Sequence, residues 1–337
     1  MNKLLVFFPK FVRAFKRRIS NGEFLYKFLS PFLPVLVKMF GYMAETGYGT
    51  DRCLKQGFLP MRIHYYSPVP DLLDLRQRQI WQRKSGLSGL DFRAEQQVDF
   101  LRSLGAQYGG ECNWPSTSTG NPQEFFTENN SFSFGCAASL HSILRYYKSR
   151  KVIEIGSGNS SLIFSAALRR NLVDGHPSEY MIIDPYPAPL VKNGLTALTK
   201  VIPERVELVD ITLFSDLSAG DILFIDSGHT VRTGGDVNFL FLDVLPRLAP
   251  GVIVHIHDIN LPYEYPEVYF TNPSFRMFWT EAYLLQAFLA FNSEFEVLLA
   301  LNYLMNDKKD EFCKAFPYYD PALHKAISGS FWMRRKK

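Results

Sequence analysis

Cysteine is scarce in this 337-residue chain, and its four cysteines form no CxxC pair and no zinc-finger spacing. We expect reduced, buried thiols of a cytoplasmic protein, at Cys53, Cys112, Cys136 and Cys313. Long apolar runs are also missing, because no uncharged stretch approaches the roughly 20 residues that span a bilayer. The basic residues of segment 10–18 follow the apolar start, whereas a secretory signal peptide would place its charges first. The sequence therefore predicts neither a membrane-spanning helix nor export.

A large net charge is missing too, since the whole chain carries only +4. That charge is unevenly divided: residues 1–40 contain eight basic residues and one acid, so the remainder of the chain is slightly acidic. Because the motif-rich part has no basic excess, we expect no nucleic-acid partner. Residues 1–40 fit either a basic amphipathic helix on an anionic membrane surface or a helical arm packed on its own domain.

Composition divides the chain into three segments. Residues 1–60 form a basic, apolar helical arm, and residues 61–131 form a helical and loop extension that is expected to cover the site. Within the extension, residues 91–104 have apolar side chains at helical spacing, with Asp91 as the expected N-cap. Residues 132–337 form the third segment, an α/β domain.

Short apolar runs rich in β-branched residues alternate with helical patterns from residue 132 onward. The expected strands are residues 152–155, 180–184, 205–210, 221–226, 251–258, 294–301 and 328–335. Runs that are apolar on both faces are typical of central strands in a parallel sheet covered by helices. We therefore predict a doubly wound, mostly parallel, Rossmann-like α/β sheet, with the ligand site at the carboxyl ends of its strands. Four of the runs end in acids at that edge: Asp184, Asp210, Asp226 and Asp258.

A glycine turn follows the first expected strand, in KVIEIGSGNSS (151–161). A dinucleotide site would carry GxGxxG, but Ser161 stands at the third glycine position, so the pattern is weak evidence for NAD. No GK[ST] follows, which excludes a P-loop. Two acidic residues also belong to this region: Glu154 lies two residues before the first glycine, and Asp184 lies at the end of the second expected strand.

The glycine turn flanked by Glu154 and Asp184 resembles class I S-adenosylmethionine-dependent methyltransferases. The resemblance implies S-adenosylmethionine as the cofactor, with backbone amides of the turn near its methionine part and the acid of strand two on its ribose hydroxyls. Cofactor contacts are expected from Glu154, Gly156, Ser157, Gly158, Ser160, Asp184, Asp210 and Asp226. Ser160 departs from the pattern, because many class I enzymes have glycine there.

Three further stretches resemble the methyltransferase-24 group found in bacterial polysaccharide and glycan gene neighbourhoods. They are IDSGH (225–229), HIHDI (255–259) and WTEAYLLQAFL (279–289). This resemblance implies methylation of a sugar hydroxyl in a surface glycan or its precursor, by a cytoplasmic enzyme that could lie on the inner face of the membrane. O- and N-methylation remain undistinguished, because one fold and cofactor site serve both.

His229 is the expected general base, because a hydroxyl acceptor must lose a proton and His229 follows the strand-end acid Asp226. His257 and Asp258 are expected at the reaction centre, and Asp226 is expected to serve both cofactor and catalysis. With Asn260, the two acids also resemble the magnesium ligands of catechol-type methyltransferases, although Ile259 interrupts that spacing. The need for a divalent metal such as magnesium remains open.

Two other functions remain open. An NAD-dependent sugar oxidoreductase would share the fold, but Ser161 counts against it. A non-catalytic, membrane-associated binding subunit would share it too, but such a subunit needs neither the strand-end acids nor His229.

Overall fold

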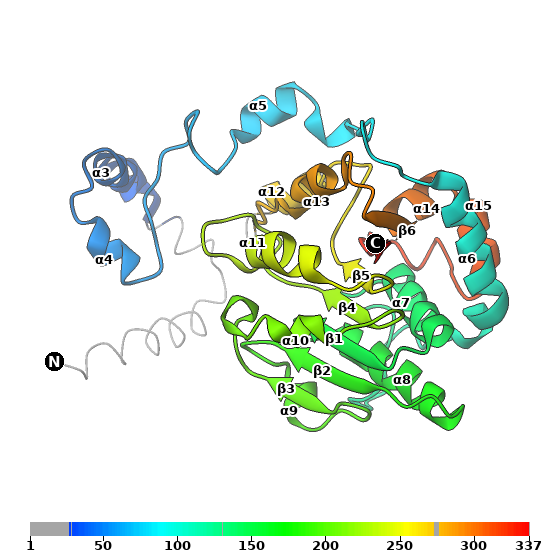
Figure 1. Cartoon of the computed structure of the whole chain (residues 1–337). Coiled ribbons are helices and arrows are strands. Elements are labelled where there is room, and N and C mark those ends of the chain that lie inside the picture. Colours follow the sequence, from blue (N-terminus) through cyan, green and yellow to red (C-terminus); the bar gives the residue numbers. More distant parts are fainter. Residues whose placement is uncertain (1–26, 28, 130, 273–275, 337) are drawn as a thin grey trace. The chain divides into compact units, whose positions relative to one another are not determined.

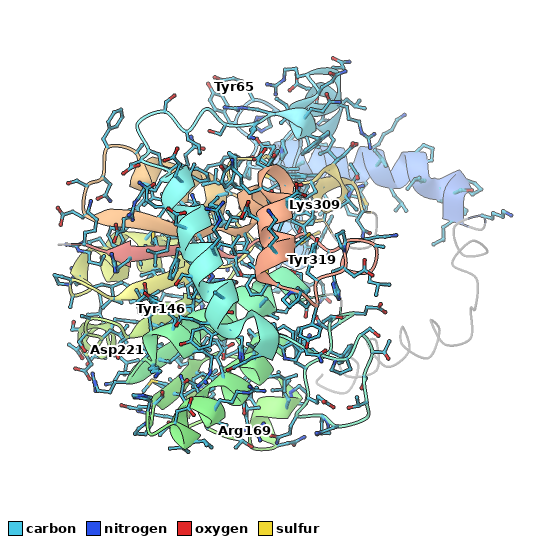
Figure 2. All side chains as sticks on the ribbon, turned by 90° about the vertical axis from the view of Figure 1, so that its right-hand side faces the viewer. Tyr65, Tyr146, Arg169, Asp221, Lys309 and Tyr319 are labelled. Atoms are coloured by element: carbon cyan, nitrogen blue, oxygen red, sulfur yellow. The ribbon has the colours of Figure 1, made fainter. Side chains whose placement is uncertain are left out.

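A computed structural model describes residues 27, 29–129, 131–272 and 276–336 (Figure 1). The chain forms two compact units, Met1–Gln77 and Arg78–Lys337. This division differs from the expected boundaries after residues 60 and 131. The reason is α6 (Ala94–Tyr108), which packs against α15 (Lys309–Ala315) and β6 (Phe295–Ala300) and so belongs to the second unit (Figure 2).

The first unit is helical where the structure describes it. Its elements are η1 (Ser30–Phe32), α3 (Leu33–Thr46), α4 (Thr50–Leu54) and α5 (Leu72–Gln77). α3 ends at Thr46 and is followed by Gly47, whose φ of 72° is the left-handed conformation that glycine readily supplies after a helix. Most of the basic segment discussed above, residues 1–26, lies outside the described residues. No helix in the described part of either unit is long and apolar enough to cross a membrane.

The second unit is built on one seven-stranded sheet with the order β3-β2-β1-β4-β5-β7-β6. Besides β6, its strands are β1 (Lys151–Ile155), β2 (Glu179–Ile183), β3 (Lys200–Ile202), β4 (Ile222–Ile225), β5 (Ile253–Ile256) and β7 (Phe331–Arg335). The first five strands are parallel, and β7 runs antiparallel to both β5 and β6. The expected doubly wound, mostly parallel, Rossmann-like sheet is confirmed.

Helices cover both faces of the sheet. Figure 1 shows α6, α7 (Phe134–Tyr147) and α8 (Asn159–Val173) along one side and α11 (Asp236–Phe239) and α13 (Glu281–Leu289) along the other. The remaining elements are η2 (Ile80–Gln82), η3 (Gly109–Glu111), α9 (Pro189–Lys192), η4 (Val206–Leu208), α10 (Thr212–Ser215), η5 (Leu240–Val244), η6 (Leu245–Arg247), α12 (Glu267–Thr271) and α14 (Leu301–Asp307).

Two local predictions were wrong. Residues 205–210 do not form a strand: β3 lies earlier and ends at Ile202, because Pro203 has no N–H to continue the ladder, and Val206–Leu208 is a 3-10 helix instead. Asp91 does not cap α6, because the chain turns at Arg93, whose φ is 51°, and the helix begins at Ala94.

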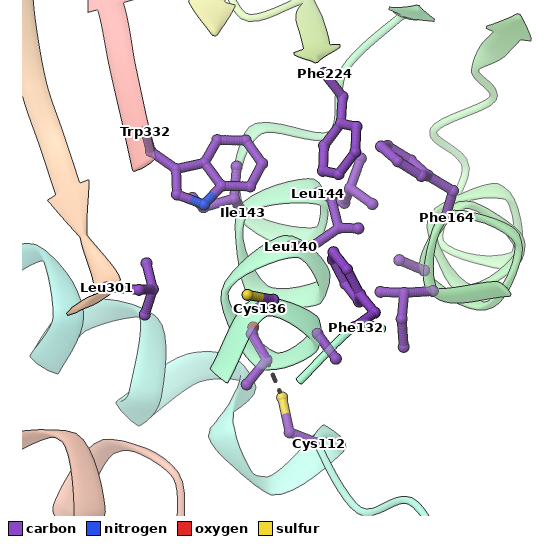
Figure 3. Close-up of a cluster of buried hydrophobic side chains, with 14 of the residues drawn as sticks. Cys112, Phe132, Cys136, Leu140, Ile143, Leu144, Phe164, Phe224, Leu301 and Trp332 are labelled. Carbon is purple, nitrogen blue, oxygen red and sulfur yellow. Dashed lines mark hydrogen bonds between the residues drawn. The ribbon is translucent and has the colours of Figure 1, made fainter. Parts of the chain in front are cut away.

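Large aromatic side chains fill the core between the sheet and the helices α7 and α8. Phe224 of β4, Phe164 of α8 and Trp332 of β7 converge there (Figure 3), with Phe164 5.1 Å from Phe224 between ring centroids. The His255 ring stacks on Phe224 at 3.9 Å and is fully buried, so His255 is a core residue. This packing fixes β4 beside β1, where the strand order reverses and α/β sheets bind their ligands.

Candidate functional site

The glycine turn after β1 lies directly against the end of β4. Gly156 has a φ of 80°, and a Cβ atom at this position would lie 2.1 Å from the carbonyl oxygen of Asp226. Both the left-handed backbone and the close approach therefore require glycine. The Asp226 N–H donates to the carbonyl of Ile155 at 2.9 Å, so the ends of β1 and β4 are tied together.

Glu154 lies beneath this turn and is fully buried. Its carboxyl group accepts hydrogen bonds from Ser160 (2.6 Å), from Ser161 (3.0 and 3.1 Å) and from Tyr180. Burial raises the pKa of Glu154 to about 8, although the three hydroxyl groups oppose that rise. Glu154 thus anchors the start of α8 from below, and the Ser160 hydroxyl that departs from the class I pattern is one of its partners.

Asp184, at the end of β2, joins the glycine turn to the loop that follows. Its Oδ2 accepts from the Ser157 hydroxyl at 2.6 Å, and its Oδ1 accepts from the Tyr186 N–H at 2.7 Å. The Ser157 Oγ in turn accepts from the Ala188 N–H at 3.1 Å. Gly158 precedes α8, and its N–H donates to Ser161 Oγ at 3.2 Å.

A pocket of about 470 Å³ opens at this edge of the sheet, within the size range of small-molecule sites. Of the expected cofactor residues, it is lined by Gly156, Asp184 and Asp226, while Glu154, Ser157, Gly158 and Ser160 support the turn behind it. Asp210 does not line it: this exposed side chain accepts from the Thr212 N–H at 2.9 Å, at the start of α10. Residues 205–207 of the region expected to be a strand line the pocket instead.

A second group of polar side chains begins at Asp226. The Nε2 atom of His229 lies 3.2 Å from Asp226 Oδ1 and 3.6 Å from Asp258 Oδ2. The Nδ1 atom of His257 lies 3.4 Å and 3.6 Å from the same two oxygens. The structure therefore brings together all four residues that the sequence singled out for catalysis.

His229 is held firmly from behind. Its Nδ1 atom lies 2.8 Å from Oε2 of Glu281, a fully buried residue in the first turn of α13. Its carbonyl accepts from the Thr280 N–H at 2.9 Å, and its φ is 54°. The sequence analysis missed Glu281, although a lone carboxylate among the apolar residues of the α13 pattern was a usable signal.

The charges around His229 decide its protonation. Burial opposes a charged imidazole, but hydrogen bonds with Asp226 and Glu281 outweigh burial and raise the pKa of His229 to about 10. Burial likewise opposes ionisation of Asp226, yet His257 and His229 hold the pKa of that carboxyl below its usual range. The neighbouring carboxylates therefore favour the protonated form of His229, whose two ring nitrogens both face acids.

We compared the chain with known protein families, proteins and structures. Residues 153–259 match the model of a family described as "Methyltransferase domain", a segment that holds both the glycine turn and the His229 cluster. The match supports a methyltransferase domain in this part of the chain. An uncharacterized protein of Archaeoglobus fulgidus is 28% identical over 212 residues, which cover 60% of this chain and 94% of that protein. A crystal structure described as "a putative methyltransferase from Thermobifida fusca YX" aligns with 75% of this chain and 96% of its own, at 14% identity and a TM-score of 0.35, too low to add to the assignment.

Proposed function

We propose that the protein is an S-adenosylmethionine-dependent methyltransferase. The observation that carries the proposal is the position of Asp226, which lines the pocket beside Gly156 and Asp184 and also belongs to the His229 cluster. A cofactor in the pocket would therefore lie next to the cluster of acids and histidines around His229.

The pocket residues fit the cofactor by their chemistry. The Asp184 carboxylate has oxygens that can accept from two ribose hydroxyls, and the glycine turn exposes backbone at its edge. When bound, the cofactor supplies the methyl group as an electrophile. The chain supplies alignment, which can contribute about 7–11 kcal/mol to such a displacement.

His229 stays the proposed base for the acceptor's proton. Asp226 and Glu281 raise the pKa of His229 and so favour its protonated form. His229 could act as the base itself only after losing the proton on Nε2.

We further propose a sugar hydroxyl of a surface glycan or its lipid-linked precursor as the acceptor. The resemblance of 225–229, 255–259 and 279–289 to glycan-associated methyltransferases supports this substrate class. The first unit supports binding of the protein to an anionic membrane surface. None of the residues of α3 is buried, and α3 follows the basic N-terminal segment in the sequence. The exposed apolar side chains of α3 are Leu33, Val35, Leu36, Val37, Met39, Phe40 and Tyr42.

Co-sedimentation with vesicles tests the membrane part of this proposal. The full chain should sediment with vesicles that contain anionic lipid, and a form lacking residues 1–40 should not. Neutral vesicles are the control, because the charge of the segment predicts weaker binding to them, as does added salt. Equal sedimentation of the two protein forms would remove the membrane role.

Calorimetric titration tests the cofactor. We expect S-adenosylhomocysteine to bind and NAD not to bind. Asp184→Asn should weaken S-adenosylhomocysteine at least tenfold, about 1.4 kcal/mol, whereas Asp210→Asn, a matched change outside the pocket, should leave its affinity unchanged. Binding of NAD alone would favour the oxidoreductase, and binding of neither would favour the non-catalytic subunit.

A further inference from the structure

We propose that a second cavity, next to the His229 cluster, binds a neutral sugar ring of the methyl acceptor, with aromatic side chains of the cavity against the face of the ring. The inference rests on the methyltransferase proposed above and assigns its acceptor a place. The cavity measures about 550 Å³, and its walls come mainly from segments 127–135 and 319–328. Of the described residues, none lines both this cavity and the cofactor pocket.

The cavity adjoins the His229 cluster at the backbone of Asp258. β7 runs antiparallel to β5, so the residues before β7 lie at the carboxyl end of β5. There the Ile259 N–H donates to the carbonyl of Gly329 at 2.8 Å, and a Cβ atom on Gly329 would lie 2.6 Å from the Cα atom of Asp258. Ser328, the residue before Gly329, lines the cavity, whereas Asp226 of the same cluster lines the cofactor pocket. The cluster therefore adjoins both cavities.

The loop before α7 makes a second connection between the cavity and the reaction centre. The ring of Phe132 lies 5.1 Å from the ring of His257, which faces both acids of the cluster. Ser133, the next residue, lines the cavity. Ser131 accepts from the Asn159 side chain at 2.7 Å, at the start of α8. The loop thus extends from the end of the glycine turn to the wall of the cavity.

Three aromatic rings form one wall of the cavity. His324 stacks on Phe134 with ring centroids 4.6 Å apart, and Tyr319 lies 5.6 Å from both rings. Phe134 is buried, whereas His324 and Tyr319, which is labelled in Figure 2, are partly exposed. The C–H groups on the face of a pyranose ring pack well on an aromatic ring, because the aromatic face carries negative charge density. The two partly exposed rings therefore provide a platform for a sugar.

A buried hydroxyl group in the lining lacks a partner. Thr127 is 8% exposed, and among the described residues its Oγ1 atom finds no hydrogen-bond partner. Such a group is energetically costly, and a hydroxyl group of the ligand would satisfy it. His324 supplies a donor: its Nδ1 accepts from the Asp320 N–H at 3.0 Å, and burial lowers its pKa, so the neutral ring carries its proton on Nε2. The lining thus combines aromatic rings with groups that bind hydroxyl groups.

The charges of the lining indicate a neutral ligand. Among the described lining residues, one acid, Glu128, balances one base, Lys325. Sites for phosphate or carboxylate groups contain instead an excess of arginine or lysine. We therefore expect a neutral pyranose ring rather than a sugar phosphate.

Ligand-observed NMR of the full chain, with S-adenosylhomocysteine present, tests the site. The probes are the methyl α-pyranosides of glucose, galactose and mannose, with glucose 1-phosphate and catechol as comparisons. We expect a methyl pyranoside to bind, and glucose 1-phosphate to bind no more tightly. Thr127→Val and Tyr319→Leu should each weaken the pyranoside about two- to tenfold, the effect of losing one hydrogen bond or one aromatic contact. Thr117→Val and Tyr318→Leu, at exposed positions outside the lining, are the matched controls and should change nothing.

Stability separates a binding role of Thr127 from a structural one. Because its hydroxyl group has no partner in the free protein, Thr127→Val should weaken sugar binding without lowering the free energy of unfolding. A loss of stability with unchanged sugar binding would contradict the role of Thr127 in the site.

Three further results would overturn the proposal. If the unaltered protein binds S-adenosylhomocysteine but none of the pyranosides, the sugar site is wrong and the methyltransferase stands. Binding of catechol in place of the pyranosides would make the acceptor an aromatic compound, and tighter binding of glucose 1-phosphate would contradict a neutral ring. Failure of S-adenosylhomocysteine to bind reports separately, because it would remove the proposed function itself.

Discussion

Glu154 and Glu281 are both fully buried beside the carboxyl edge of the sheet, yet the protein stabilises them in opposite ways. Glu154 is surrounded by the hydroxyl groups of Ser160, Ser161 and Tyr180, and its raised pKa keeps it largely protonated at neutral pH. Burial raises the pKa of Glu281 as well, but Glu281 faces the ring of His229, whose hydrogen bond and charge oppose that rise. The difference separates a carboxyl group that neutral hydroxyl groups surround, under the glycine turn, from one that contacts a histidine ring beside Asp226 and Asp258.

The largest expected effect comes from replacing each acid with its amide. Glu281→Gln should lower the free energy of unfolding by about 3–5 kcal/mol, because it removes one partner of a buried charge pair. Glu154→Gln should raise it by up to about 3 kcal/mol at pH 7, because the buried carboxyl group must take up a proton when the chain folds at that pH and the amide need not. Urea denaturation measures both, in the presence of EDTA.

Glu95→Gln, in the exposed first turn of α6, is the control and should stay within about 0.5 kcal/mol. Equal losses for the two buried acids would show that Glu154 is charged in the native protein, and the contrast between the two sites would disappear.

The stability of the protein should depend on pH differently at Glu154 and at His229, the partner of Glu281. Glu154 titrates near 4.5 when unfolded and near 8 when folded, so the native state binds the extra proton and stability falls as pH rises from 4.5 to 8. His229 titrates near 6.5 unfolded and near 10 folded, so its contribution is complete below pH 6.5 and is lost as pH rises to 10.

Each group contributes a slope of at most about 1.4 kcal/mol per pH unit within its window. Glu154→Gln should therefore flatten the stability profile of metal-free protein on the acid side, and His229→Gln should flatten it on the alkaline side. A profile from pH 4.5 to 10 for the three proteins checks this. Flattening in the same window by both variants would contradict separate sites.

The sequence predicted most of the sheet and the residues that gather at its edge. Apolar runs located six of the seven strands, since a strand buried on both faces must be apolar throughout. The strand expected at 205–210 failed because an apolar run beside Pro203 does not reveal whether it pairs. Strand ends also brought Asp226, His229, His257 and Asp258 together, because neighbouring parallel strands end at one edge.

Contacts between distant segments were beyond the sequence. Glu281 lies 52 residues from His229, and nothing in either segment shows that α13 presents its first turn to the loop after β4. Those contacts raise the pKa of His229, and the sequence alone did not reveal this effect on its protonation. Asp210 was assigned to the site only because it was placed at the end of a strand that does not form.

The smallest expected effect concerns the serine that replaces the usual glycine of the class I pattern. Ser160→Ala should lower the free energy of unfolding by about 1 kcal/mol, the usual net value of one hydrogen bond. Ser161→Ala should cost more, because its hydroxyl contacts both oxygens of Glu154 and also accepts from the Gly158 N–H. If Ser160→Ala is neutral while Ser161→Ala is not, Glu154 is held by Ser161 and Tyr180 alone, and the serine at 160 has no part in neutralising the buried carboxyl group.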